Sequence, residues 1–184
     1  MISREEALKL IDEYLKNPNL KKHVLAVEAI MAALAEKLGE DVEKWRLIGL
    51  LHDLDYEITS DDFSKHGIKT VEILGDKIDE NMREAIMAHN FENTGVEPKS
   101  LVAKALIAAD AVSGLIIATA LVMPSKKLHE VKLKTLKKKF KDKSFARGSK
   151  RERILMCEEI GIPLVDFLEI SLKALQEIAD KLGL

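Results

Sequence analysis

The sequence predicts an all-α fold, on three observations. Ala, Leu, Ile, Glu and Lys are the dominant residues of the 184-residue chain, which has only 9 glycines and 4 prolines, and this balance favours helix over sheet. Apolar residues recur at helical spacing along most of the chain, and no segment alternates as a strand does. With 47% hydrophobic and 33% charged residues, the chain can bury a sizeable core, so one domain over residues 1–184 is expected.

The N-terminal part predicts two helices, which Pro18 separates. Ser3, followed three residues later by Glu6, has the pattern of a capping box that opens the first helix. The second helix should end at Gly39, because glycine readily adopts the left-handed conformation that terminates helices. One histidine, His23, shares the apolar face of this second helix. That face consists of Leu20, Val27, Ile30, Leu34 and Leu38.

Three more helices are predicted between residues 41 and 90, and each carries a histidine at an end or on its apolar face. Aspartates in N-cap positions, Asp41 and Asp79, open the first and the third of them. The polar stretch 59–65 separates the first from the second, and residues 90–98 are expected to form a loop. The ligand-type residues of this region are His52, followed directly by Asp53, then His66 and His89.

Residues 101–123 are mostly apolar and approach the length of a membrane span. Lys104 and Asp110 argue against a span, because a carboxylate in the middle of an apolar helix is costly without a partner. A buried core helix that presents Asp110 to a metal explains both the apolarity and the single acid. The single cysteine excludes an intramolecular disulfide framework, and the N-terminus lacks the pattern of a signal peptide. We therefore expect no membrane partner and a cytoplasmic location.

The C-terminal part is predicted to contain a basic, partly exposed segment over residues 126–153 and an amphipathic helix over residues 163–184. Most of these cations should form a solvated face. Arg147 precedes Gly148, where the backbone can approach a ligand closely, and a guanidinium can bind a phosphate with two hydrogen bonds. Lys126 directly follows the helix of Asp110. We expect Arg147 and Lys126 to bind substrate phosphate, and exposed apolar positions on the last helix could support a homodimer.

Four of the five histidines and two aspartates follow one another in an order typical of a metal centre: His23, His52-Asp53, His66, His89 and Asp110. Each residue alone has an ordinary explanation, such as a core histidine, a helix cap or an ion pair. Together they are more informative. The adjacent imidazole and carboxylate of His52 and Asp53 offer a divalent ion a neutral nitrogen and an anionic oxygen from one short stretch of backbone.

This order on successive helices resembles the HD-domain superfamily of metal-dependent phosphohydrolases over roughly residues 20–120, and looks closest to its small, stand-alone hydrolases. In the HDIG branch the doublet continues as Ile-Gly, whereas here it reads His52-Asp53-Leu54-Asp55. The resemblance implies a helical bundle with a metal pocket between the helices. It also implies that His23, His52, Asp53 and Asp110 bind a first metal. His66 and His89 would bind a second, with Asp53 as the bridge.

One position departs from the pattern. Some dinuclear members have two adjacent histidines where this chain has His89-Asn90. Asparagine is a poorer metal ligand, so the second site is expected to be weak, absent, or completed by water and substrate.

The resemblance implies hydrolysis of a small phosphate ester, such as a nucleotide, by metal-activated water. Asp53 and Asp55 are the expected catalytic residues, although Asp55 could instead support a ligand from behind. Nitrogen-rich ligation favours iron, zinc, manganese or nickel, and magnesium is compatible. The alternative is a nucleic-acid- or nucleotide-binding module with a structural or degenerate metal site. The aromatic content of 4% disfavours nucleic acid as a partner, because single strands normally stack on aromatic side chains.

Overall fold

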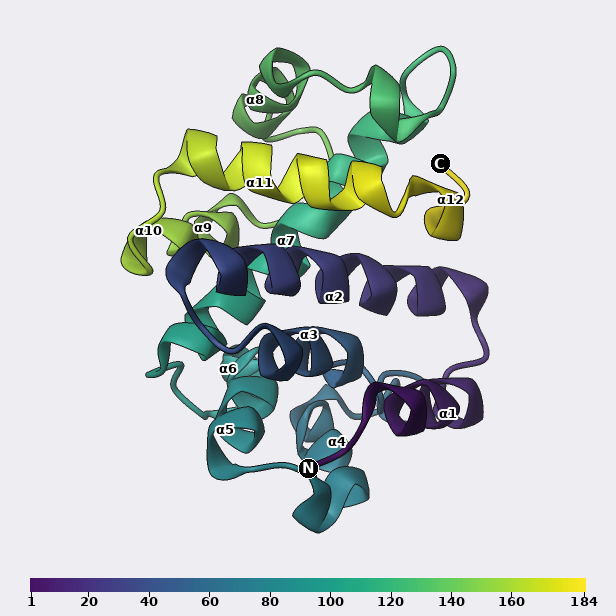
Figure 1. Cartoon of the computed structure of the whole chain (residues 1–184), viewed down its shortest axis with the longest axis vertical. Helices are drawn as coiled ribbons and strands as arrows, with labels where there is room; N and C mark the ends of the chain where they lie inside the picture. Colours follow the sequence, from purple (N-terminus) through teal and green to yellow (C-terminus); the bar gives the residue numbers. More distant parts are fainter.

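The structure, a computed structural model, describes residues 1–184 as helices joined by turns and loops, with no strand (Figure 1). The predicted all-α class is therefore confirmed. The α-helices are α1 (Arg4–Tyr14), α2 (Pro18–Leu38), α3 (Val42–Leu51), α4 (Ile68–Leu74), α5 (Glu80–Ala88), α6 (Phe91–Thr94), α7 (Leu101–Leu121), α8 (Leu133–Lys141), α9 (Arg151–Ile154), α10 (Met156–Glu159), α11 (Leu164–Glu177) and α12 (Ala179–Leu182). Short 3-10 turns are η1 (Phe63–Lys65), η2 (Gly75–Lys77) and η3 (Leu128–Glu130).

The helix ends follow the local signals of the sequence. The Ser3 side chain accepts the Glu6 backbone N–H at 3.2 Å, and the Glu6 carboxylate accepts the Ser3 N–H at 2.9 Å, which completes the capping box of α1. Helix α2 ends at Gly39 in the left-handed conformation, with φ of 71°. The side chains of Asp41 and Asp79 cap α3 and α5. These caps satisfy backbone groups that helix ends leave unpaired.

Two predicted segments differ from the structure. Within the expected loop 90–98, the Asn90 carbonyl accepts the N–H groups of Asn93 and Thr94, which forms the single turn α6. The expected last helix divides into α11 and α12 at Ile178. After this division the Leu184 carbonyl accepts the Leu128 N–H at 3.2 Å. Both differences depend on turns too short to produce a periodic pattern.

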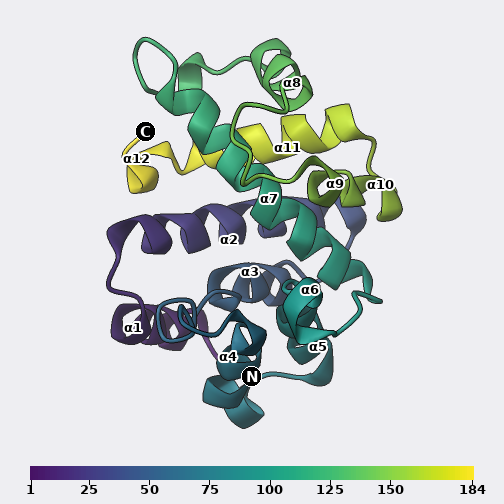
Figure 2. The same cartoon turned by 180° about the vertical axis from the view of Figure 1, so that it is seen from behind.

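Helix α2 lies at the centre of the fold and packs against α3, α7 and α11. Figure 2 shows α7 crossing α2 and α11, with α9 and α10 packed along it. Gly49 permits the close contact between α2 and α3, because a Cβ there would lie 2.8 Å from the Val27 carbonyl oxygen. This contact brings the C-terminal end of α3 towards the α2 face that carries His23. The core is one cluster of 47 buried hydrophobic residues.

Helix α7 is long and apolar enough to cross a membrane by length and composition. In the fold, 67% of its most apolar window is buried by the surrounding helices. Its apolarity is thus explained by packing, since α2, α5, α8, α9, α10 and α11 all contact it. The same packing holds Asp110, midway along α7, against the other ligand-type residues.

Candidate metal centre

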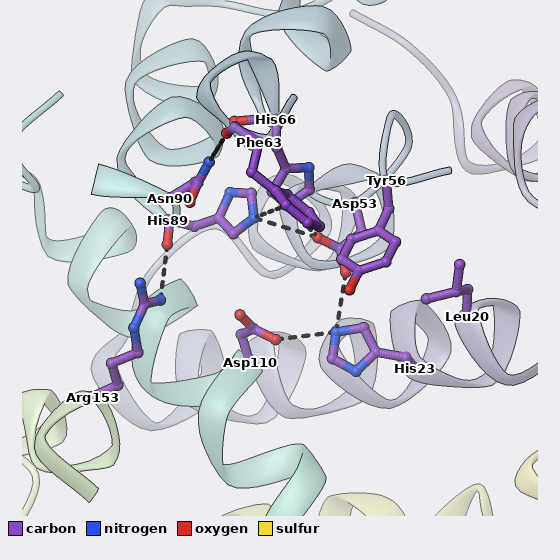
Figure 3. A pocket seen from close by; sticks show the side chains of 10 residues that line it. All are labelled: Leu20, His23, Asp53, Tyr56, Phe63, His66, His89, Asn90, Asp110 and Arg153. Carbon is purple, nitrogen blue, oxygen red and sulfur yellow. Dashed lines mark hydrogen bonds and ion pairs between the residues drawn. The ribbon is translucent and has the colours of Figure 1, made fainter. Parts of the chain in front are cut away.

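Five separate elements bring the six ligand-type residues together. Five of them line one pocket of about 400 Å³ (Figure 3), and His52 is fully buried beside Asp53. Helix α2 supplies His23, and α7 supplies Asp110. His52 is the C-cap of α3 and is followed by Asp53, and His89 is the C-cap of α5. His66 precedes α4. The structure therefore gathers all the residues that the sequence marked as metal ligands.

The carboxylate of Asp53 lies at the centre of this cluster and approaches all four imidazoles. Its Oδ1 atom is 3.3 Å from His52 Nε2, 3.2 Å from His66 Nε2 and 3.3 Å from His89 Nε2. Its Oδ2 atom is 3.3 Å from His23 Nε2. Two groups of ligand atoms share it, His23–His52–Asp53 and Asp53–His66–His89, each with its atoms within 4.8 Å of one another. Asp53 thus occupies a bridging position between two candidate sites.

Asp110 joins the first of these groups. Its Oδ1 atom lies 3.0 Å from His23 Nε2 and 3.9 Å from His52 Nε2. The first group therefore offers two imidazole nitrogens and two carboxylates, whereas the second offers two imidazole nitrogens and the shared carboxylate.

The Nδ1 atom of each candidate ligand imidazole forms a hydrogen bond on the side of the ring away from the centre. Such a bond fixes the ring orientation, and an Nδ1–H donor leaves the Nε2 lone pair free to bind a metal. The Nδ1 partners are the Gly49 carbonyl for His52 (2.8 Å), the Ile86 carbonyl for His89, Asp55 Oδ1 for His66 (2.7 Å) and Ser113 Oγ for His23 (3.4 Å). All four Nε2 atoms face the Asp53 carboxylate.

The nitrogen atoms at the centre fit a bound cation. His52 Nε2 is buried and has no hydrogen-bond partner. The Nε2 atoms of His66 and His89 lie 3.0 Å apart, although both Nδ1 atoms already have partners. Buried lone pairs that face one another are costly without a cation or a proton between them. Convergent imidazole and carboxylate donors are those that divalent transition metals accept.

Without a metal ion, protonated imidazoles supply part of the positive charge at the centre. Burial lowers the pKa of His23, but the hydrogen bonds and charges of Asp110 and Asp53 outweigh it and raise this pKa to about 9. Burial also lowers the pKa of His66, but the carboxylates of Asp53 and Asp55 outweigh it and raise this pKa to about 9. Despite burial, the histidines hold the pKa of Asp53 and that of Asp110 well below their usual range.

Asp55 lies behind His66 and not in the pocket. It is fully buried, and one carboxylate oxygen is 2.7 Å from His66 Nδ1. Its other oxygen accepts the backbone N–H groups of Gly67 at 2.8 Å and Thr70 at 2.9 Å. The expectation that Asp55 is a catalytic residue is corrected, because its carboxylate is enclosed by these partners. Its place is that of a residue that positions His66.

Asn90 also has a supporting position. Its side-chain amide donates to the carbonyl oxygens of Phe63 at 2.8 Å and His66 at 3.1 Å, and its Oδ1 accepts from Asn93. These bonds hold the turn before α4 against the end of α5. With its polar atoms used in this way, Asn90 adds no ligand to the second group.

The two expected phosphate-binding residues do not line this pocket. Lys126 lies beyond the end of α7, and the segment from Asp110 to Leu121 spans about 16 Å at the rise of an α-helix. Arg147 is exposed and lines another hollow, with Lys143 and Arg151. Lys126 and Arg147, which we expected to bind substrate phosphate, are therefore not among the residues that line the metal pocket. Nearness to Asp110 in sequence did not reveal the direction in which the chain leaves α7.

The cation that does line the pocket is Arg153 of α9 (Figure 3). Its Nη1 donates to the His89 carbonyl at 2.9 Å, and its Nη2 lies 3.6 Å from Glu92. The guanidinium also stacks near Phe91, at 5.1 Å from the ring centroid. Only 14% of its side chain is exposed. In the sequence Arg153 is one of many cations between residues 126 and 153, and no local signal distinguishes it.

Comparisons with known proteins agree with this centre. Residues 20–115, just over half of the chain, match the model of the HD domain family. Similar curated proteins include Ribonuclease Y of Staphylococcus epidermidis, 37% identical over 97 residues, and Ribonuclease Y of Geobacter sulfurreducens, 34% identical over 98 residues. The matches cover 52% of this chain but only 18% of each relative. No solved structure gives a significant match. On the match of its helical core and on its gathered histidines and aspartates, the chain belongs to the HD domain family.

Proposed function

We propose that this chain is a metal-dependent phosphohydrolase that acts on a small phosphate ester, such as a nucleotide. The observation that carries the proposal is the position of Asp53, whose one carboxylate is shared by two groups of imidazoles. Iron, zinc, manganese or nickel suit the nitrogen-rich donors, and magnesium remains compatible. His23, His52, Asp53 and Asp110 would hold one ion, and Asp53, His66 and His89 a second.

A divalent ion held here would lower the pKa of a water molecule and polarise a phosphoryl oxygen. The side chains that line the pocket include no serine, threonine, cysteine or lysine. The one cysteine, Cys157, is buried, and burial raises the pKa of its thiol to about 12. Because the carboxylates and imidazoles of this pocket would hold the ions, attack by water suits it better than attack by one of those side chains.

Arg153 supplies the positive charge that an anionic substrate needs. It is anchored by the His89 carbonyl, so its guanidinium is held beside the ligands at little further loss of side-chain freedom. Leu20, Tyr56 and Phe63 line the same pocket, and the rings of Tyr56 and Phe63 meet edge to face at 5.6 Å. These apolar surfaces suit the organic part of a phosphate ester.

A second candidate function is the binding or cleavage of a polynucleotide. Two observations favour it: the similar curated proteins are named Ribonuclease Y, and the basic segment 126–153 includes the lysine-rich helix α8. If the chain only bound a polynucleotide, the metal centre would be structural, and the basic segment would hold the nucleic acid.

Hydrolysis assays on metal-loaded protein test these functions. The substrates are p-nitrophenyl phosphate, bis(p-nitrophenyl) phosphate, adenosine 5′-monophosphate and a short oligoribonucleotide, each with manganese, iron, nickel, zinc or magnesium. We expect release of phosphate from the small esters, lost on chelation and in Asp53→Asn. Cleavage of the oligoribonucleotide alone would favour the polynucleotide substrate. Absence of all turnover, together with salt-dependent RNA binding, would favour the binding module.

A further inference from the structure

A second hollow of about 480 Å³ adjoins the metal pocket. The two share His23, Asp110 and Arg153. The rest of its wall consists of Ala111 and Gly114 of α7 and of Ala146, Gly148, Ser149 and Lys150 from the loop before α9. A molecule bound at the metal ligands can therefore extend past Arg153 to this loop.

The loop is held in shape by Arg151, whose side chain does not line the hollow. The N–H groups of its guanidinium lie within hydrogen-bond distance of six backbone carbonyls, at 2.7 to 3.0 Å, and Nη2 shares its two hydrogens among three of them. Those carbonyls belong to Lys139, Phe140, Asp142, Phe145, Ala146 and Ser149. Ala146 is held with a positive φ of 47°, which a residue other than glycine rarely adopts. A loop fixed in this way is already shaped for a ligand, so less conformational entropy is lost on binding.

The loop also lies directly on α7. A Cβ at Gly114 would be 2.6 Å from Ser149 Oγ, so the absence of a side chain there allows the contact. Gly148 has the opposite character, because a Cβ built on it would meet nothing within 4 Å. The loop therefore closes against the helix at Ser149 and leaves open space at Gly148.

Two cations, Lys150 and Arg153, line this wall. Lys150 Nζ lies 3.1 Å from Glu92, and Arg153 Nη2 lies 3.6 Å from the same carboxylate oxygen. The single carboxylate of Glu92 thus pairs with two cations. The Lys150 side chain is 47% exposed, so it can turn to a ligand without leaving a buried contact. Asp110, which also lines the hollow, is a candidate metal ligand.

We infer that this hollow is a subsite for a second anionic group, a phosphate or a carboxylate, on the same substrate molecule. The inference rests on the proposed function for the reacting phosphate, which would lie at the metal ligands. Arg153 then stands between the two anionic groups, and Lys150 contacts the second. The substrate class becomes a phosphate ester that carries another negative charge a few bonds away.

Calorimetric titration of metal-loaded protein with three phosphonates tests the subsite, because their carbon–phosphorus bond is not hydrolysed. Propylphosphonate has one anionic group. 3-Phosphonopropanoate adds a carboxylate, and propane-1,3-bisphosphonate adds a second phosphonate. We expect the second group to strengthen binding by about tenfold, as a charge-assisted contact does. Comparison of the last two probes shows which anion the hollow prefers.

The Lys150→Gln variant should lose most of this gain and bind propylphosphonate as the unchanged protein does. The control is Lys143→Gln, an exposed lysine of the same segment that does not line the hollow, and it should keep the gain. A gain that survives Lys150→Gln, or an equal loss for all three probes, would overturn the subsite. Hydrolysis assays separate the two proposals. Turnover of an ester without the gain in affinity would reject only the subsite. The gain in affinity without turnover of any ester would reject only the phosphohydrolase activity.

Discussion

Asp55 Oδ1 lies 2.7 Å from His66 Nδ1, while the Nε2 atom of the same ring lies 3.2 Å from Asp53 Oδ1. One imidazole therefore connects a fully buried carboxylate to the bridging carboxylate of the metal centre. A carboxylate behind a histidine ligand fixes the ring and raises its basicity. The orientation of His66, a candidate ligand of the second group, thus depends on a residue that does not line the pocket.

The first prediction concerns this support. Asp55→Asn should weaken metal binding at the His66–His89 group by about 10- to 100-fold. An amide cannot accept from His66 and from both backbone N–H groups with two oxygens, as the carboxylate does. Metal content after dialysis against a graded chelator measures the effect. Asp61→Asn, at an exposed position in the same polar stretch, is the control. Equal metal retention in both variants would contradict the positioning role.

The second prediction concerns metal stoichiometry. Asp53→Ala should lose essentially all metal, because Asp53 belongs to both groups of ligands. His66→Ala should lose only the metal of the second group, and Asp110→Ala should weaken only the first. Elemental analysis of the purified variants gives the ratios. If Asp53→Ala retained the wild-type content, the bridging assignment would be wrong.

The third prediction concerns pH. The pKa values of His23 and His66 rise from 6.5 to about 9 in the metal-free fold. Stabilisation from these raised values is complete below about pH 6.5 and is lost as the pH rises towards 9. Metal binding needs the neutral imidazoles, so metal affinity should increase over the same window. His89, whose pKa burial lowers, reduces stability only below that window.

Thermal unfolding measures this difference. Between pH 6.5 and 9 the Tm of chelator-treated protein should fall, and the increase in Tm on metal addition should grow. Curves that stay parallel with and without metal would show that these imidazoles do not bind it.

The fourth prediction compares two arginines. Arg153→Ala should raise the KM for a phosphate ester by about 10- to 100-fold, because a charge-assisted contact is worth about 1.5–3 kcal/mol. Arg147→Ala should leave kcat and KM unchanged, since Arg147 lines a separate hollow. Steady-state kinetics on folded variants decides between them. A raised KM in Arg147→Ala with an unchanged KM in Arg153→Ala would show that Arg147 binds the phosphate.

The fifth prediction tests the contact between α7 and the loop. Gly114→Ala places a Cβ 2.6 Å from Ser149 Oγ, and overpacking of this kind costs about 1–3 kcal/mol of stability. Ser149→Ala in the same chain removes Oγ and leaves the Cβ atoms about 4.0 Å apart. The double variant should regain the loss, helped by the higher helix propensity of alanine. Denaturant unfolding of the four proteins gives the coupling energy. A double variant no more stable than Gly114→Ala would show that the contact is not there.

The sequence by itself determined most of the long helices and marked the candidate ligands. The capping box at Ser3, the terminator Gly39 and the cap Asp41 act on backbone groups within a few residues of themselves. Their effect can therefore be predicted from neighbours in the chain. The order of His23, His52-Asp53, His66, His89 and Asp110 resembles that of the HD domain family, and this resemblance predicted a shared metal pocket.

Only the tertiary structure decided which charged side chains serve that pocket. Asp55 follows the doublet closely, yet its carboxylate turns to His66, 11 residues further along the chain. Arg153 rather than Arg147 reaches the ligands, because Arg151 fixes the preceding loop through six carbonyls and Ser149 rests on Gly114. Contacts of this kind join residues that are distant in sequence and carry no periodic pattern. The direction in which an exposed cation points is set by these contacts and not by its neighbours in the chain.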